Sequence, residues 1–421
     1  MKSYPKMKDS GVEWIGEIPE HWNVLRLKYL ADITTGGKDT VDNEEDGRYP
    51  FFVRSQTIER ISTYSCDEEA VLTAGDGVGV GKVFHYINGK FDFHQRVYKI
   101  SNFKKITGKY FYHYMKENFY KEVMKLSAKS TVDSLRLPMV QNFPIAFGNQ
   151  EESIRIAIFL DNQISRIDSE LERNQKLVEL LKEKRQVTIN HAVTKGLDLS
   201  VPMTDSGIEW IGKIPKHWNV RKLKSLCDLI TDGSHFSPEH QDNGFPMATV
   251  ENIKNNKVDI LSCHKITKSD FELLIKNGCQ PEENDVLFTK DGTIGVSIVY
   301  NQDDKIVLLS SIAIIRNTKS ILSPNFCKFF LDSDLIKTQI GKESHGSALQ
   351  RLILKQIKNF TFLTPPLNDQ KQIADFLDKE TSKINLLLSK TESQIEKLED
   401  FRQSLTSSAV TGKIDVRGTI V

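Results

Sequence analysis

The sequence has no long hydrophobic run and no segment typical of exported proteins. Within its 421 residues there is no stretch of about 18 apolar residues, the minimum for a membrane-spanning helix. The first residues, MKSYPKMKDSG, have no apolar core after their lysines, so we expect no signal peptide. These absences predict a cytoplasmic protein without a membrane partner.

Cysteine is also scarce, and its spacing excludes two kinds of site. The five cysteines are Cys66, Cys227, Cys263, Cys279 and Cys327, and no two of them form a CxxC pair. Disulfide frameworks and zinc sites need paired, closely spaced cysteines. We therefore expect reduced thiols and no metal site.

An excess of one charge is missing as well. The chain has 57 Lys and Arg against 56 Asp and Glu, a formal net charge of +1. Nucleic-acid-binding domains tend to be basic, so this balance alone gives no support for such a function.

Catalytic motifs are absent in the forms that their chemistry requires. The glycine loop at 75–81 precedes Lys82, but Asp76 occupies a position where a phosphate-binding loop needs glycine, and a strand is expected next instead of a helix. Pro365-Pro366 is followed by leucine and not by the aromatic residue of an amino-methyltransferase motif. A nuclease-like pattern near 281–305 has the wrong first residue, so we expect no enzyme active site.

A tandem duplication dominates what is present. Residues 9–30 and 205–226 are identical at 16 of 22 positions, at a constant shift of 196. Residues 156–194 and 373–411 match without a gap at a shift of 217, with 15 of 39 positions identical. Each copy thus consists of a first repeated segment, a variable stretch and a second repeated segment. This order occurs twice and predicts two homologous units of about 200 residues with pseudo-twofold symmetry.

The second conserved segment of each copy predicts a long helix. Apolar residues recur there at alternating steps of three and four, a coiled-coil pattern. Two such helices most simply pack on each other; the alternative is that each packs on its own globular domain. If they pair, Asn174, Thr391 and the matched Arg185 and Arg402 would set the register. The expected apolar seam consists of Ile164, Ile167, Leu171, Val178, Leu181, Ile384, Leu388, Ile395, Leu398 and Leu405.

Each variable stretch reads as mixed α/β with one order of elements. In the first, strands are expected around 71–73, 82–86 and 91–100, with a hairpin turn at Asn88-Gly89 and a helix over about 110–124. In the second, strands are expected at 286–289, 296–300 and 306–315, with a helix over about 324–340. The predicted class is α+β: two homologous mixed α/β domains together with two long coiled-coil helices.

These residues resemble a known family. The repeated GxIPxxW (16–22 and 212–218), the variable α/β domain and PPLNDQKQIADFLD (365–378) at the start of a long helix are similar to specificity (S) subunits of type I restriction–modification systems. TDGSH (231–235), LFTKDGTIG (287–295) and GSALQRLIL (346–354) look like motifs of the target recognition domains of that family. The first copy departs from the pattern, because it lacks the Pro-Pro pair and has TTGGKDT (34–40) in place of TDGSH.

The resemblance implies a non-catalytic subunit that recognises double-stranded DNA. Target recognition domains at 1–150 and 197–366 would each read half of a split, asymmetric site. Two long antiparallel spacer helices would separate the domains and fix the gap, one at 151–196 and one at 367–421 together with a C-terminal tail. Two methyltransferase (M) subunits would carry S-adenosylmethionine, and restriction/translocase (R) subunits would use ATP and magnesium; this subunit would hold no cofactor. Helices of about 30 residues, about 45 Å long, would separate the domain centres by roughly 10–14 base pairs.

Candidate DNA contacts follow from alignment and side-chain chemistry, since Gln and Arg suit base edges and Lys, Ser and Thr suit phosphates. In the first domain they are Lys38, Arg54, Gln56, Lys82, His94, Gln95, Arg96, Ser130, Thr131 and Arg136. In the second domain they are Asp232, His235, Lys290, Asp291, Thr293, Ser311, His345, Ser347, Gln350 and Arg351.

The neutral total also hides a division within each domain. Residues 30–76 carry 4 basic and 11 acidic side chains, whereas 77–148 carry 12 and 4. We expect the basic later parts to face DNA. Two other functions remain open: a self-sufficient DNA nuclease or methylase, and a coiled-coil adaptor without a DNA role.

Overall fold

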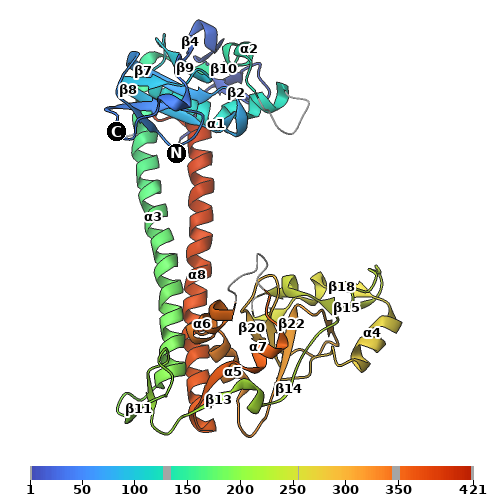
Figure 1. Cartoon of the computed structure of the whole chain (residues 1–421). Coiled ribbons are helices and arrows are strands. Elements are labelled where there is room, and N and C mark those ends of the chain that lie inside the picture. The colour runs from blue at the N-terminus through green and yellow to red at the C-terminus, as the bar shows by residue number, and fades with distance from the viewer. Residues whose placement is uncertain (1, 127–133, 255, 344–350, 419–421) are drawn as a thin grey trace. The chain divides into compact units, whose positions relative to one another are not determined.

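The computed structural model describes residues 2–126, 134–254, 256–343 and 351–418. It contains two compact units, each of which combines helices with small sheets (Figure 1). Unit 1 comprises Met1–Gln175 and Glu392–Val421, and unit 2 comprises Lys176–Thr391. Each unit therefore contains part of both long helices, whereas the expected division treated each helix as a separate segment. The predicted α+β class is confirmed.

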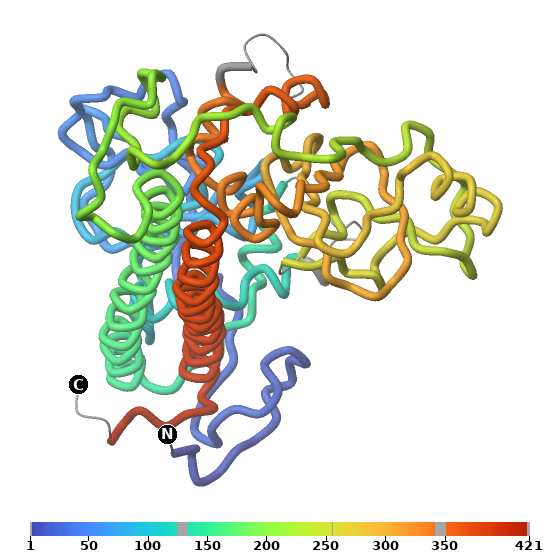
Figure 2. Tube along the Cα trace, turned by 90° about the horizontal axis from the view of Figure 1, so that it is seen from below, coloured from blue at the N-terminus to red at the C-terminus, as the bar shows by residue number. Residues whose placement is uncertain are grey.

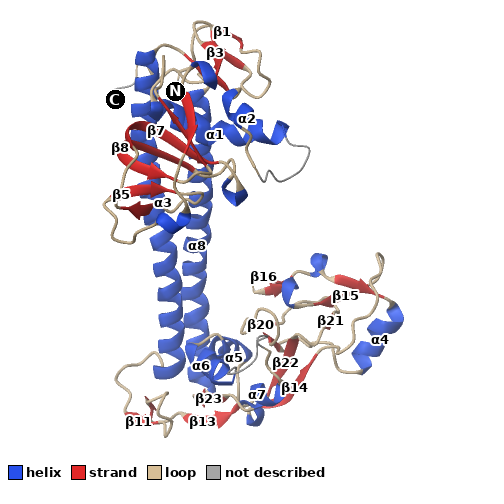
Figure 3. Ribbon diagram, turned by 45° about the horizontal axis from the view of Figure 1, so that its top comes forward, coloured by secondary structure: helices blue, strands red, loops and turns tan. Residues whose placement is uncertain are grey.

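Unit 1 is built on a six-stranded sheet with the order β4-β9-β7-β8-β5-β6 (Figure 3). All neighbours are antiparallel except β5 and β8, which run parallel. The strands are β4 (Asp32–Thr35), β5 (Tyr49–Phe52), β6 (Glu59–Ile61), β7 (Cys66–Ala74), β8 (Phe84–Phe93) and β9 (Val97–Ser101). Two short antiparallel pairs join β1 (Met7–Asp9) to β2 (Glu17–Pro19) and β3 (Asn23–Arg26) to β10 (Pro144–Phe147).

The predicted hairpin turn at Asn88-Gly89 is wrong. Strand β8 runs straight through both residues, and Asn88 and Gly89 lie opposite Glu69 and Glu68 of β7. Strand β8 continues to Phe93, and His94, Gln95 and Arg96 connect it to β9, which pairs with the other edge of β7. An Asn-Gly pair favours a turn locally, but here the long β7 partner extends the ladder past it.

Helix α1 (Gly108–Leu126) covers one face of the unit 1 sheet (Figure 3). Its buried aromatic stripe, which includes Phe111 and Phe119, packs with Val71 of β7 and Phe84 of β8. Tyr110 donates its hydroxyl toward the carbonyls of Ala146 (2.6 Å) and Val410 (2.9 Å). The second contact satisfies one of the last carbonyls of a long helix, groups that have no partner within the helix itself.

Unit 2 repeats this strand order in shorter pieces. Its main sheet has the order β14-β22-β19-β20, which corresponds to β4-β9-β7-β8. A second sheet has the order β18-β15-β21, and the pair β15 and β21 is parallel, like β5 and β8. In unit 1 the single strand β8 pairs with both β7 and β5. In unit 2 two strands, β20 and β21, make the corresponding pairs, and residues 300–306 separate them.

The bounds of the remaining elements are as follows. The strands of unit 2 are β11 (Met203–Asp205), β12 (Lys213–Pro215), β13 (Asn219–Lys222), β14 (Cys227–Asp232), β15 (Phe245–Ala248), β16 (Ile253–Lys254), β17 (Lys257–Val258), β18 (His264–Ile266), β19 (Val286–Thr289), β20 (Ser297–Val299), β21 (Val307–Leu308), β22 (Ile312–Asn317) and β23 (Thr361–Thr364). The shorter helices are α2 (Leu137–Gln141), α4 (Lys268–Lys276), α5 (Pro324–Leu331), α6 (Asp334–Glu343) and α7 (Leu354–Lys358). Strands β11–β12, β13–β23 and β16–β17 form antiparallel pairs.

The two long helices are α3 (Gln150–Lys195) and α8 (Leu367–Val410), with 46 and 44 residues. Helix α3 lies within one residue of the segment 151–196, and both helices are longer than the roughly 30 residues used to estimate the domain separation. Within each unit their segments lie side by side and antiparallel (Figures 1 and 2). All ten expected seam residues are buried or half-buried. In unit 1, Ile167, Leu171 and Leu405 belong to the same hydrophobic cluster as the globular core. In that unit the helices therefore pack on each other and on the globular domain, so the two alternatives are not exclusive.

Arg402 and Arg185, which occupy matched positions in the two long helices, pair with different kinds of partner. Arg402 of α8 lies with its Nε 3.4 Å from Asp168 Oδ1 of α3, so it joins the two helices in unit 1. Arg185 of α3 instead approaches Asp332 Oδ2 at 4.0 Å, between α5 and α6. The expectation that Arg185 sets the helix register is therefore wrong, because its guanidinium pairs with Asp332 of the globular domain and not with the other long helix.

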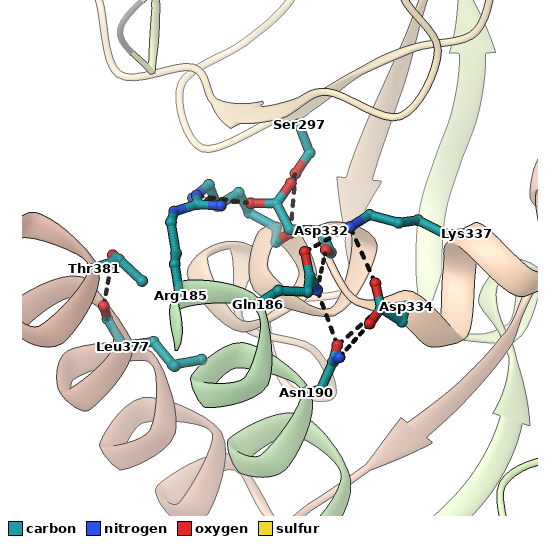
Figure 4. A network of polar contacts seen from close by, with 10 residues as sticks. Arg185, Gln186, Asn190, Ser297, Asp332, Asp334, Lys337, Leu377 and Thr381 are labelled. Carbon is teal, nitrogen blue, oxygen red and sulfur yellow. Dashed lines mark hydrogen bonds and ion pairs between the residues drawn. The ribbon is translucent and has the colours of Figure 1, made fainter. Parts of the chain in front are cut away.

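This contact belongs to a polar network that fastens α5 and α6 to α3 in unit 2 (Figure 4). Gln186 Nε2 donates to the Asp332 carbonyl at 3.2 Å, and Asn190 Oδ1 accepts from the Asp334 backbone N–H at 2.9 Å. Lys337 Nζ donates to Gln186 Oε1 at 2.5 Å. Asn190 of α3 thus supplies an acceptor at the start of α6, whose first N–H groups have no partner within the helix.

Candidate nucleic-acid interface

The same backbone hydrogen bonds form a small frame in both units, where the loop after β7 or β19 meets the turn before β9 or β22. In unit 1, Gly75 N–H donates to Arg96 O (2.8 Å) and Leu135 N–H donates to Gly75 O (2.7 Å). In unit 2, Lys290 N–H donates to Ser311 O and Leu352 N–H to Lys290 O, both at 2.8 Å. Gly75 and Lys290 therefore occupy equivalent positions, as do Arg96 and Ser311.

A glycine packs against this frame in each unit. A Cβ on Gly36 would lie 2.0 Å from Phe93 O, and a Cβ on Gly233 would lie 2.0 Å from Leu308 O. Real Cβ atoms do not approach backbone oxygens so closely, so only glycine fits without moving a strand. TTGGKDT and TDGSH, which looked unrelated in sequence, therefore share one backbone requirement.

Asp76 organises the charged side chains of the unit 1 frame. Its two carboxylate oxygens accept from Arg54 Nη1 at 2.9 Å and from Arg96 Nη1 at 2.7 Å. Partial burial acts to raise the pKa of Asp76, but hydrogen bonds from both guanidinium groups hold it below its ordinary value. The side chain of Arg54 is 41% exposed and that of Arg96 61%, and each has guanidinium N–H groups beyond the one bound to Asp76. The carboxylate thus fixes two donors at the surface.

A second carboxylate, Asp39, organises the neighbouring residues. Gln95 Nε2 donates to Asp39 Oδ2 at 2.6 Å, and the Gln95 N–H donates to Lys38 O at 2.8 Å. His94 is only 2% exposed and its Nδ1 accepts from the Arg96 N–H at 2.9 Å. His94 is therefore a buried support for the turn, while Gln95 and Arg96 lie at the surface.

The remaining unit 1 candidates lie on exposed loops. Gln56 Nε2 donates to Lys82 O at 2.9 Å, which joins two loops that are distant in sequence. His85 supports the same region through a 2.8 Å contact to Ser55 O, and burial lowers its pKa below the usual value. Arg136 is exposed just before α2. Ser130 and Thr131 lie outside the described residues.

The unit 2 frame contains a buried ion pair in addition to a surface guanidinium, that of Arg351. Lys290 Nζ lies 3.1 Å from Asp232 Oδ2, and the two side chains are 3% and 9% exposed. His235 Nε2 contacts the other oxygen of Asp232 at 3.2 Å and is itself exposed. Lys290 and Asp232 are thus in the interior, so the structure assigns them a supporting position and leaves His235 at the surface.

The exposed polar atoms of unit 2 surround Asp291. Arg351 Nε lies 3.3 Å from Asp291 Oδ2, with side-chain exposures of 50% and 40%. Thr293 is exposed in the loop after β19, and its carbonyl accepts from the Thr289 hydroxyl, 2.5 Å away. Ser311 Oγ is buried without a hydrogen-bond partner among the described residues. His345, Ser347 and Gln350 lie outside the described residues.

Sequence reasoning missed the two carboxylates that orient the unit 1 donors, Asp39 and Asp76. A signal for Asp76 was available, because Asp76-Gly77 and Asp291-Gly292 fall at equivalent places in the repeat. Asp39 carried no such signal, since its role depends on the Lys38–His94 bridge between segments far apart in sequence.

Two absences hold for the described part of the chain. Within it, no group of three or more His, Cys, Asp or Glu side chains is arranged to hold a metal ion. No helix there has both the length and the apolar character needed to cross a bilayer.

Comparison with known proteins agrees with this architecture. The family model described as "Type I restriction modification DNA specificity domain" matches twice, at residues 19–179 and 215–397. The MjaVIII specificity subunit of a type I restriction enzyme from Methanocaldococcus jannaschii is 24% identical over 95% of this chain and 94% of its own. The EcoBI specificity subunit of Escherichia coli is 21% identical over 96% and 89%. The EcoDI specificity subunit of E. coli is 28% identical, but that match spans 53% of this chain and 55% of the relative.

Solved structures show the same fold. A chain from a structure titled for complex assembly and conformational transition of the type I R-M system aligns with a TM-score of 0.62 at 14% identity, over 94% of this chain and 99% of that one. The HsdS subunit from Thermoanaerobacter tengcongensis aligns with a TM-score of 0.50 at 14% identity, over 94% and 98%.

Proposed function

Because the chain belongs to the family of type I restriction–modification specificity subunits, we propose that its two frames are the surfaces that read DNA. The observation that carries the proposal is that both units keep the same backbone hydrogen bonds but present different side chains on them. A shared scaffold with different polar groups is what an asymmetric, two-part DNA site requires, since base identity is read by the donors and acceptors of side chains. Each target recognition domain, 1–150 and 197–366, would read one half.

Residue roles follow from exposure and pairing. Arg54, Arg96 and Arg351 are the proposed base readers, because each is an exposed guanidinium held by a carboxylate and can donate to guanine O6 and N7. The half-buried Lys38 and exposed side chains on the surrounding loops would contact bases or phosphates; the exposed ones are Gln56, Lys82, Gln95, Arg136, His235 and Thr293. His94, Asp232, Lys290 and Ser311 would position the readers, and Asp291 would orient Arg351.

The two long helices are the proposed spacer. Helix length in residues would fix the distance between the two halves of the recognised sequence, because an α-helix rises about 1.5 Å per residue and resists compression. We assign no catalytic step to this chain. Two methyltransferase subunits with S-adenosylmethionine, and restriction subunits with ATP and magnesium, would act on DNA that this subunit selects in the cytoplasm.

The basic residues that follow 76 in the first domain would add phosphate contacts. With a net charge of +1, the isolated chain would bind duplex DNA weakly and depend on the methyltransferase subunits for affinity.

Replacing one arginine of each unit by alanine tests whether the two frames read different halves of the DNA site. Arg96→Ala and Arg351→Ala are introduced separately into the chain. Each variant is assembled with methyltransferase subunits of the same system, and the methylated adenines are mapped by single-molecule sequencing. Each change should cost about 1–3 kcal/mol and relax one base in one half of the site, a different half for each variant. Lys82→Ala is the matched control, expected to weaken all sequences alike.

Three results would contradict the proposal. If both arginine variants lost specificity in the same half of the site, the two domains would not each read one half. Methylation by the purified chain alone would favour a self-sufficient enzyme. Absence of any salt-dependent binding to duplex DNA, with or without the methyltransferase subunits, would favour an adaptor without a DNA role.

A further inference from the structure

A buried carboxylate near the start of α3 holds three donors in unit 1. Glu152, 3% exposed, accepts from Trp22 Nε1 at 3.1 Å and contacts His21 Nε2 at 3.0 Å. The third donor is the Tyr4 hydroxyl. Tyr4 is 5% exposed and packs against both rings, with centroid separations of 5.7 Å to His21 and 6.1 Å to Trp22.

The equivalent place in unit 2 has the tryptophan and histidine but lacks the tyrosine. The shift of 196 puts His217 and Trp218 at the positions of His21 and Trp22, and the shift of 217 puts Asp369 at that of Glu152. His217 Nε2 contacts Asp369 Oδ2 at 2.9 Å. Trp218 is 5% exposed, and its indole nitrogen has no hydrogen-bond partner among the residues that the structure describes. A buried N–H without an acceptor costs about 1–3 kcal/mol.

The second copy has a proline where the first has Gly148, and this difference accounts for the shorter carboxylate, Asp369, in unit 2. A Cβ on Gly148 would lie 1.9 Å from Glu152 Oε2 and 2.7 Å from Trp22 Nε1. Unit 2 has Pro365 at that position, and its ring excludes the geometry in which a longer carboxylate reaches the indole. The aspartate therefore pairs with His217 alone.

One small residue replaces two large ones in unit 2. Ser200 corresponds to Tyr4 at the shift of 196 and to Arg417 at the shift of 217. In unit 1 the Arg417 guanidinium lies 4.8 Å from the centroid of the Tyr4 ring and is held by Asp415. In unit 2, Asp198 has the place of Asp415 and accepts from Ser200 N–H at 2.9 Å and Ser200 Oγ at 2.7 Å.

Unit 2 has a cavity among the residues that correspond to the surroundings of Tyr4 and Arg417 in unit 1. Its volume is about 290 Å³, and its lining includes His217, Trp218, Asp369, Gly196, Val201 and Ile373. Leu199 beside it is 79% exposed, whereas Val416, its counterpart in unit 1, is 1% exposed. Unit 2 therefore presents an open polar cavity next to an uncovered apolar side chain.

We propose that this cavity binds a tyrosine side chain from a partner polypeptide, with a neighbouring basic residue, in the way that Tyr4 and Arg417 bind in unit 1. The phenol hydroxyl would donate to Asp369, and its oxygen would accept from the Trp218 N–H. The carboxylates of Asp369 and Asp198 favour a basic residue next to the tyrosine, and Leu199 would be covered by the partner chain. This site does not depend on the DNA-reading assignment.

The test uses the full chain and a synthetic peptide with the sequence of its own first eight residues, MKSYPKMK. Binding is followed by calorimetry and by NMR of the indole N–H resonances, with Trp22 as an internal reference. The tyrosine peptide should bind and shift the Trp218 resonance, and replacement of its tyrosine by phenylalanine should weaken binding about tenfold. Ser200→Tyr should fill the cavity from within the chain and weaken binding of the peptide at least about tenfold, whereas Ser269→Tyr, on exposed α4, should bind like the parent.

Other outcomes would overturn the proposal. Equal binding of peptides that carry tyrosine or alanine would show no tyrosine site. A shift of Trp22 instead of Trp218 would mean that the peptide displaces Tyr4, which favours exchange of N-terminal segments between two copies of the chain. Unchanged peptide binding by Ser200→Tyr would place the site elsewhere. Half-site specificity in the methylation assay should be unaffected by Ser200→Tyr, so this result is separable from the DNA proposal.

Discussion

Units 1 and 2 have the same strand order and the same frame hydrogen bonds, yet they place their charges at different depths. Unit 1 buries a carboxylate near the start of α3, where Glu152 holds Tyr4, His21 and Trp22, and keeps its frame guanidiniums at the surface. Unit 2 buries a Lys–Asp pair in the frame, and the corresponding indole has no acceptor within the described part of the chain. The comparison teaches that the duplication preserved backbone geometry while the polar side chains diverged.

The shared backbone predicts the largest effect. Gly36→Ala and Gly233→Ala each place a Cβ where a backbone oxygen lies 2.0 Å away. Both should destabilise their own unit by a similar amount, about 3 kcal/mol or more, because a strand must move. Urea denaturation followed by tryptophan fluorescence measures this; Gly37→Ala, with open space around its Cβ, is the control. A large loss for one glycine and none for the other would break the equivalence of the frames.

The buried carboxylates should differ strongly between units. Glu152→Ala leaves three donors without their acceptor and should cost about 3–5 kcal/mol. Asp369→Ala removes only a contact to His217, whose side chain is 41% exposed, and should cost less than about 1 kcal/mol. Differential scanning calorimetry of the two variants against the parent chain compares them. Equal losses would mean that Asp369 holds more than His217.

The buried pair of the unit 2 frame should show coupling. Lys290→Met leaves the Asp232 carboxylate with only the exposed His235 and should cost about 2–3 kcal/mol. The double variant Lys290→Met with Asp232→Asn should recover part of that loss, because no buried charge remains unpaired. Chemical denaturation of the two single variants and the double variant gives the coupling energy. Strict additivity would show that the two side chains do not interact.

The smallest effect concerns pH in unit 1. The pKa of Asp76 is lowered in the folded state by Arg54 and Arg96. A depressed carboxyl pKa contributes stability that is present above the unfolded value of about 3.9 and lost as pH falls through the folded pKa. Asp76→Asn should therefore lower stability at pH 7 and have the same stability as the parent chain at strongly acidic pH. A constant difference at all pH values would exclude ionisation of Asp76 as the cause.

Periodicity and repetition were strong enough in the sequence to predict the main architecture. The shifts of 196 and 217 predicted two homologous units, and the three-four spacing predicted two long helices whose apolar positions from Ile164 to Leu405 are buried or half-buried. The helices are longer than expected because their first turns, before Ile164 and Ile384, pack on globular cores and do not follow the seam pattern.

Local signals failed where long-range pairing decided the outcome. Asn88-Gly89 is a strong turn signal, but pairing with Glu68 and Glu69 of β7 keeps it in a strand. The division of the first variable domain into an acidic and a basic part also does not produce separate layers, because β7 from the acidic part lies between β8 and β9 from the basic part.

By itself, the sequence determined the duplication, the fold class, the long helices and the membership of a DNA-specificity family, because these depend on patterns repeated along the chain. Only the tertiary structure decided which candidates are buried, such as His94 and Lys290, and which carboxylates orient the exposed arginines. It also revealed the cavity beside Trp218. Those properties arise where segments distant in sequence meet, and a side chain's depth and partner there are set by the packing of both segments.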